Sequence, residues 1–138
     1  MTLMSNDHRL PRILVVDDEA VVRQFVERVL RDAGYEVAVA QGGPEALAIV
    51  DEQRPFDLFV IDVTMPDMSG DELARRLRQR FQRVEVLFFT AHSDLLFEDR
   101  AALEAHEAFL DKPVTMKGLL EAVSLSLFGH TRGASGNS

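Results

Sequence analysis

Leu58-Phe-Val-Ile-Asp-Val-Thr-Met-Pro-Asp-Met-Ser-Gly70 joins an unbroken apolar run to a series of turn-forming residues. The apolar run 58–61 has the length of a buried strand, and the Met-Pro and Ser-Gly pairs that follow it are typical of turns. Asp62 therefore lies where a buried strand reaches a loop, which in parallel α/β sheets is the edge that binds ligands. A single Asp at such a point is more often a turn or capping residue, so its interpretation depends on the rest of the chain.

Hydrophobic periodicity predicts strands and helices that alternate along the whole chain. Further strands are expected at 13–16, 36–40, 84–89 and 108–110, and helices at about 22–33, 45–53, 70–80, 93–104 and 115–127. This alternation predicts an α/β fold, a single doubly wound parallel sheet of five strands in the flavodoxin-like order 2-1-3-4-5 with helices on both faces. The inward faces of the first and last helices are expected to carry Val22, Phe25, Val26, Val29, Leu30 and Ala33, and Met116, Leu119, Leu120, Val123 and Leu127.

Composition limits the function. The 138 residues suit one domain, and 46% of them are hydrophobic, which is enough to bury a core. The absence of Cys excludes disulfides and thiolate chemistry. The sequence also has no membrane-length apolar run and no signal-peptide pattern. Together with the absence of Cys, these features predict a cytoplasmic protein that does not insert into membranes. The net charge of -8 argues against direct nucleic-acid binding. We expect a flexible arm at 1–10, a domain at 11–128 and a disordered Gly/Ser-rich tail at 129–138.

The predicted topology brings chemically distinctive residues to one edge of the sheet. The carboxyl ends of the strands deliver Asp17 and Asp18, Asp62, Thr90 and Lys112. Each residue also has a simple structural interpretation: Asp17 and Asp18 as helix caps, Thr90 as an ordinary strand end and Lys112 as a surface lysine. Their joint occurrence at strand ends favours a functional site.

Three carboxylates in one place call for a cation. At ~5 Å and an effective dielectric near 20, each pair repels by about 3 kcal/mol. Mg²⁺ prefers oxygen ligands, and it is commonly bound by one or two carboxylates together with a phosphate. The cluster therefore predicts a Mg²⁺ site that receives a phosphoryl group, with Lys112 and Thr90 contacting phosphate oxygens. An Asp nucleophile for phosphoryl transfer fits this arrangement.

Four motifs together resemble the receiver domain of two-component response regulators, over about 12–128. They are Ile-Leu-Val-Val-Asp17-Asp18-Glu19, Asp62 followed by Met65-Pro66-Asp67-Met68-Ser69-Gly70, Phe-Phe-Thr90-Ala91, and Lys112-Pro113. By this resemblance Asp62 is the phosphoacceptor, and Lys112 binds the phosphate. Mg²⁺ is held by Asp18 directly, by Asp17 through water, by Asp62 and by the backbone carbonyl of Thr64. Thr90 and Phe109 form the switch, and the bond before Pro113 is cis.

The resemblance also implies binding partners, and the sequence differs from the family pattern at some positions. The phosphoryl donor is a sensor histidine kinase or a histidine phosphotransfer protein. An unknown downstream protein binds the face formed by the fourth helix, fifth strand and fifth helix. The domain is not an enzyme beyond its own phosphorylation and dephosphorylation. One departure is Ala105-His106, where the family has Gly-Ala.

Three alternatives stay open from the residues themselves. A phosphatase of the haloacid-dehalogenase type also uses an Asp nucleophile and Mg²⁺, but it expects an acid where Thr64 stands. A flavodoxin-like flavin carrier needs a phosphate-binding loop after the first strand, where Asp17, Asp18 and Glu19 repel a phosphate. A receiver-like interaction module without phosphorylation is the third.

Overall fold

A five-stranded parallel sheet forms the centre of the computed structural model, which describes residues 10–53, 55–91 and 107–129. The spatial order of the strands is β2-β1-β3-β4-β5, which confirms the predicted doubly wound topology. The edge position of β2 and the central position of β3 follow from this order. The strands are β1 (Arg12–Val16), β2 (Glu36–Ala40), β3 (Leu58–Asp62), β4 (Val86–Thr90) and β5 (Glu107–Asp111).

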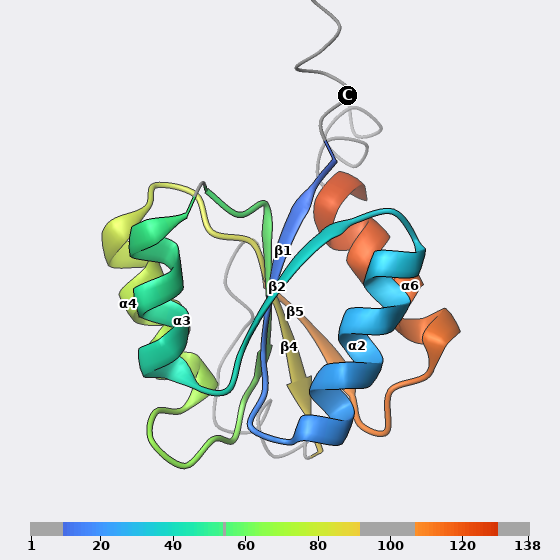
Figure 1. The fold of residues 1–138 in the computed structure, drawn as a ribbon, viewed down its shortest axis with the longest axis horizontal. Coiled ribbons are helices and arrows are strands. Elements are labelled where there is room, and N and C mark those ends of the chain that lie inside the picture. Colours follow the sequence, from blue (N-terminus) through green and yellow to red (C-terminus); the bar gives the residue numbers. More distant parts are fainter. Residues whose placement is uncertain (1–9, 54, 92–106, 130–138) are drawn as a thin grey trace, which may run out of the picture.

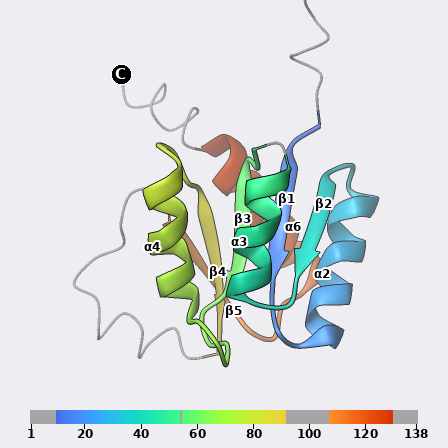
Figure 2. The same cartoon turned by 60° about the vertical axis from the view of Figure 1, so that its left-hand side comes forward.

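Helices cover both faces of the sheet. α3 and α4 lie against one face and α2 and α6 against the other, as Figures 1 and 2 show. Their bounds are α2 (Ala20–Asp32), α3 (Gly43–Glu52), α4 (Gly70–Arg80) and α6 (Met116–Ser124), and α6 continues into a π-helical turn, η1 (Leu125–Gly129). The helix predicted at 93–104 and the Ala105-His106 turn lie outside the described residues. In the part of the chain that is described, no helix is long and apolar enough to cross a bilayer.

The core consists of two apolar layers, one on each side of the sheet. Alternate strand residues point to opposite faces, so Leu14, Phe59 and Phe88 pack with α3 and α4. Ile13 and Val60 pack with the buried residues of α2 and α6. All five residues of β3 are buried, as expected for a central strand with helices on both faces. Asp62 therefore ends a strand that is buried along its whole length.

Three predicted core positions are wrong. The buried stripe of α2 consists of Val26, Val29 and Leu30. Phe25 is 39% exposed, and Ala33 at the end of the helix is also exposed. Met116, the first residue of α6, is 58% exposed. Phe25 and Met116 instead line one surface hollow.

Local turns hold the loops that carry the site. Ser69 Oγ accepts a hydrogen bond from the Glu72 N–H and so caps α4. The Gly70 N–H donates to the Val63 carbonyl at 2.8 Å, which draws the start of α4 against the end of β3. Thr115 caps α6 in the same way, since its hydroxyl accepts from the Gly118 N–H. The Lys112-Pro113 bond is cis, as the resemblance implied.

Candidate functional site

The predicted site residues come from four strands that end at one edge of the sheet. Asp62 ends β3 and pairs in register with Phe89, one residue before Thr90, while Thr90 pairs with Asp111. The Lys112 N–H donates to the Thr90 carbonyl at 2.9 Å, which fixes the chain after β5 beside the end of β4. Asp17 follows β1 directly. Parallel pairing thus brings these side chains to the lower edge of the sheet in Figure 1.

Three carboxylates meet at this edge. One oxygen each of Asp17, Asp18 and Asp62 lies within 4.8 Å of the other two. Asp17 and Asp62 are buried and Asp18 is exposed, so the cluster opens to solvent on one side. Neither Asp17 nor Asp18 caps α2: the N-cap is Glu19, whose N–H donates to Asp17 Oδ1 at 2.8 Å. The capping interpretation of the two residues is therefore wrong.

Burial raises the pKa of the two buried acids of the cluster, Asp17 and Asp62. Burial, followed by the negative charge of Asp17, raises the pKa of Asp62 from 3.8 to about 7, against the opposing effects of Lys112 and the Thr64 N–H. Burial also raises the pKa of Asp17, although the Glu19 N–H and Lys112 oppose this rise. Asp62 therefore holds its proton to a higher pH than an ordinary aspartate does. A cation at this point favours the ionised form of both acids.

The donor set fits a hard divalent cation. Asp17 Oδ2 is buried, and in the described part of the chain it accepts no hydrogen bond. A buried carboxylate oxygen that accepts no hydrogen bond is costly. Lys112 Nζ lies 3.4 Å from Asp17 Oδ2 as an ion pair, and a metal ion would supply this oxygen with a direct bond. Three clustered carboxylates provide the oxygen ligands that Mg²⁺ prefers. The residues present therefore fit the Mg²⁺ that the sequence predicts.

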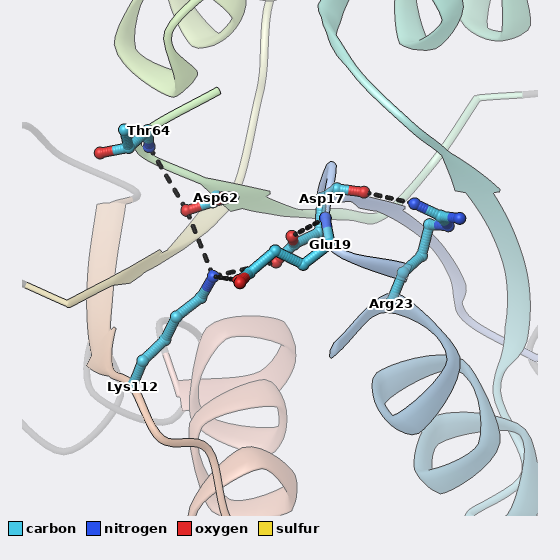
Figure 3. A network of polar contacts seen from close by, with 6 residues as sticks. All are labelled: Asp17, Glu19, Arg23, Asp62, Thr64 and Lys112. Carbon is cyan, nitrogen blue, oxygen red and sulfur yellow. Dashed lines mark hydrogen bonds and ion pairs between the residues drawn. The ribbon is translucent and has the colours of Figure 1, made fainter. Parts of the chain in front are cut away.

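Lys112 provides the positive charge of the site. Its Nζ donates to Glu19 Oε1 at 2.7 Å and lies 3.4 Å from Asp17 Oδ2 and 3.6 Å from Asp62 Oδ1 (Figure 3). Burial alone lowers the pKa of Lys112, but the hydrogen bond to Glu19 and the charges of the nearby acids outweigh it and raise the pKa above 10.5. The ammonium group is therefore charged throughout the neutral pH range.

These groups surround a cavity of about 380 Å³. Its described lining consists of Asp18, Glu19, Asp62, Thr64, Ala91 and Lys112. Thr90 is buried at the end of β4 and Phe109 stacks on Phe88, with ring centres 5.2 Å apart. Neither Thr90 nor Phe109 belongs to that described lining.

Sequence reasoning missed the contributions of two residues. Glu19 holds Lys112, and Arg23 Nη1 donates to the Asp17 carbonyl at 2.7 Å. Arg23 is half-buried near the start of α2. The available signal was the spacing, because Arg23 lies four positions after Glu19 and so shares its side of the helix.

Comparison with known proteins identifies the family. The sequence matches the profile described as the response regulator receiver domain over residues 13–124. The chain belongs to this family. Response regulator MprA of Mycobacterium sp. (strain KMS) is 42% identical to the receiver domain over 110 residues, which make up 79% of this chain and 47% of that protein. The chain thus spans about half the length of the curated relatives it matches.

Solved structures share the receiver fold. Chemotaxis response regulator CheY4 of Vibrio cholerae is 34% identical with a TM-score of 0.75, covering 86% of this chain and 100% of that chain. Response regulator TrrA of Thermotoga maritima, in complex with Mg(2+)-BeF, is 33% identical with a TM-score of 0.75 and the same coverage, 86% and 100%. This protein therefore contains the receiver domain of a two-component response regulator, and such domains are signalling domains rather than enzymes.

Replacing Asp62 with Asn is expected to stabilise the receiver domain without divalent cations, by an amount that grows as the pH rises. The pKa of Asp62 is about 7 in the folded state against an ordinary 3.8. Between these values the folded state holds a proton that the unfolded state releases, so the stability of the wild type falls as the pH rises through this window. Asn stays neutral and avoids this loss.

Thermal unfolding in a chelator at pH 5 and pH 8 checks this expectation. The melting temperature of Asp62→Asn should exceed that of the wild type by more at pH 8 than at pH 5. Asp67→Asn removes the same charge from an exposed loop residue and should show no such trend. Added Mg²⁺ should stabilise the wild type more than Asp62→Asn. A difference independent of pH would contradict the repulsive cluster.

Proposed function

We propose that this receiver domain accepts a phosphoryl group on Asp62 from the phosphohistidine of a sensor histidine kinase or a histidine phosphotransfer protein. The observation that carries the proposal is the arrangement around the Asp62 carboxylate. Lys112 Nζ lies 3.6 Å from Asp62 Oδ1 (Figure 3), and one oxygen each of Asp17, Asp18 and Asp62 lies within 4.8 Å of the other two. A nucleophilic carboxylate beside a cation and a metal-type acid cluster suits phosphoryl transfer, where catalysis consists of positioning and charge neutralisation.

The transfer exchanges one bond to phosphorus for another. An oxygen of ionised Asp62 attacks the phosphorus, the P–N bond of the phosphohistidine breaks, and its electron pair stays on the imidazole nitrogen. Lys112 donates to a phosphoryl oxygen and neutralises part of its charge. When bound to Asp17, Asp18, Asp62 and the Thr64 carbonyl, Mg²⁺ supplies charge neutralisation for the phosphoryl oxygens and the carboxylates.

The response passes through Thr90 and Phe109 in this proposal. The Thr90 hydroxyl turns toward the phosphoryl group, which leaves room for Phe109 to move further inward. Support comes from their positions, since Thr90 is buried at the strand end and Phe109 is half-buried on the neighbouring strand. Phosphorylation thereby shifts an existing equilibrium. A downstream protein reads the face formed by the fourth helix, β5 and α6.

We extend the proposal to the whole chain. The receiver domain occupies 11–128, flanked by the arm at 1–10 and the tail at 129–138, and the protein works in the cytoplasm. It catalyses only its own phosphorylation and dephosphorylation, and it does not bind nucleic acid directly, in keeping with the net charge of -8. In a protein as long as MprA, the output would belong to the sequence outside the matched region.

Intact-mass spectrometry after incubation with acetyl phosphate and Mg²⁺ tests the proposal. We expect one phosphoryl adduct on the wild type and on Asp67→Ala, which removes an exposed acid from the loop after Asp62. We expect none on Asp62→Ala and none when Mg²⁺ is chelated. An adduct on Asp62→Ala would place the acceptor elsewhere. A wild type that takes up no phosphoryl group and binds no beryllofluoride would favour the interaction module.

A further inference from the structure

The closest partner of Lys112 is a residue outside the acid cluster. Its Nζ donates to Glu19 Oε1 at 2.7 Å, whereas Asp17 Oδ2 and Asp62 Oδ1 lie at 3.4 and 3.6 Å. Only the first distance is that of a charge-assisted hydrogen bond. Figure 3 shows the Lys112 ammonium between Glu19 and Asp62. In this state Lys112 is therefore bound to Glu19 more closely than to the proposed phosphoacceptor.

Glu19 is well suited to release Lys112. It is the N-cap residue of α2, yet its side chain makes no capping hydrogen bond to that helix. The Glu19 side chain is 59% exposed, whereas that of Lys112 is 16% exposed. Breaking their contact returns the Glu19 carboxylate to water at the rim of the cavity. The ammonium group can thus move without any change in the buried core.

A phosphoryl group on Asp62 competes with Glu19 for the same ammonium. Glu19, Asp62 and Lys112 line one cavity, so the phosphoryl oxygens enter the space that these side chains share. Lys112 has three N–H donors on a flexible stem, and turning them toward the phosphoryl oxygens weakens its bond to Glu19. The Glu19 carboxylate then faces another anion with less neutralisation. Both effects favour the unphosphorylated state.

We propose that Glu19 is a positioning residue that holds Lys112 in the unphosphorylated receiver and thereby lowers the affinity of the site for a phosphoryl group. The inference rests on the proposed roles of Asp62 and Lys112. It assigns a function to the acid that directly follows the two cluster residues of the first loop. The Glu19–Lys112 ion pair opposes phosphorylation, because it must weaken before Lys112 can bind the phosphoryl group. A stronger ion pair therefore gives the site a lower affinity for the phosphoryl group.

Calorimetric titration with beryllofluoride at saturating Mg²⁺ tests the effect on affinity. Glu19→Gln keeps the shape of the side chain but removes its charge, and it should bind beryllofluoride about threefold to fivefold more tightly, the range expected for a partly exposed ion pair. Asp111→Asn is the matched control, because it removes an exposed acid next to Lys112 in the sequence, and its affinity should equal that of the wild type. Unchanged or weaker binding by Glu19→Gln would overturn the proposal, as would an equal gain in Asp111→Asn.

A second measurement does not depend on phosphoryl chemistry. The chain has two lysines, Lys112 and Lys117, so NMR of protein labelled with ¹³C at the lysine ε carbon gives two signals, which Lys117→Arg assigns. Without Mg²⁺ or beryllofluoride, Glu19→Gln should shift the Lys112 signal, and Asp111→Asn should leave it nearly unchanged. Equal Lys112 signals in Glu19→Gln and the wild type would overturn the contact. A wild type that binds no beryllofluoride, with the NMR shift present, would instead count against the proposed function.

Discussion

Replacement of Lys112 by Met is expected to slow phosphoryl uptake from acetyl phosphate by about 100-fold or more. Met keeps most of the apolar stem and removes the ammonium group, which lies 3.6 Å from Asp62 Oδ1 in a largely buried position. Removing one preorganised donor that neutralises developing charge typically costs on the order of 10²–10³ in rate. The loss should concern the transfer step, since the proposed metal ligands remain in place.

Quenched time courses of the intact mass at saturating Mg²⁺ measure this rate. Lys117→Met is the matched control, because Lys117 is the other lysine of the chain and is exposed on α6. It should take up the phosphoryl group at the wild-type rate. A Lys112→Met protein within about threefold of the wild type would remove Lys112 from the transfer step and would leave Asp62 to react without its help.

Replacement of Gly70 by Ala is expected to lower the free energy of unfolding by about 2 kcal/mol or more. A Cβ atom at this position would lie 2.5 Å from the Asp62 carbonyl oxygen and 2.9 Å from Val63 Cα. These are backbone atoms at the end of the central strand, so they cannot turn aside as a flexible side chain can. The start of α4 must then move away from β3 and carry the loop of the site with it.

Urea denaturation of Gly70→Ala beside Gly42→Ala measures this cost. Gly42 is the N-cap of α3, and a Cβ atom there would meet nothing within 4 Å, so its variant should stay within about 1 kcal/mol of the wild type. Gly70→Ala should also bind Mg²⁺ more weakly, because the displaced loop carries Thr64, whose carbonyl is a proposed metal ligand. Equal stabilities of the two variants would show that the α4–β3 contact adapts easily.

The sequence was sufficient for the features that depend on hydrophobic periodicity and strand order. The strand that ends at Asp62 and the meeting of Asp17, Asp62 and Lys112 followed from parallel topology alone. The boundaries of the buried faces were less predictable: Phe25 and Met116 fit the helical period, but both are exposed and line a surface hollow. Periodicity reports which side of a helix is apolar, whereas burial depends on how far the neighbouring elements extend.

The Glu19–Lys112 contact could not be predicted from the sequence, for a different reason. The two residues are 93 positions apart, and their contact depends on side-chain conformations at the rim of the cavity. Strand order brings both to the same edge of the sheet, but it does not say which of three nearby carboxylates the ammonium group prefers. That choice depends on differences of about 1 Å, which only the three-dimensional arrangement provides.

The residues of the site come from four strands, so the site is complete only in a chain whose sheet has fully folded. The acids of the first loop are synthesised early, but their cationic partner arrives only after β5, next to the last helix. A chain that emerges from the ribosome, or one that has lost its last strand, holds the carboxylates without Lys112. By our proposal, such a chain takes up phosphoryl groups poorly. Only molecules with a complete sheet would then be phosphorylated, and incompletely folded molecules would not contribute to signalling.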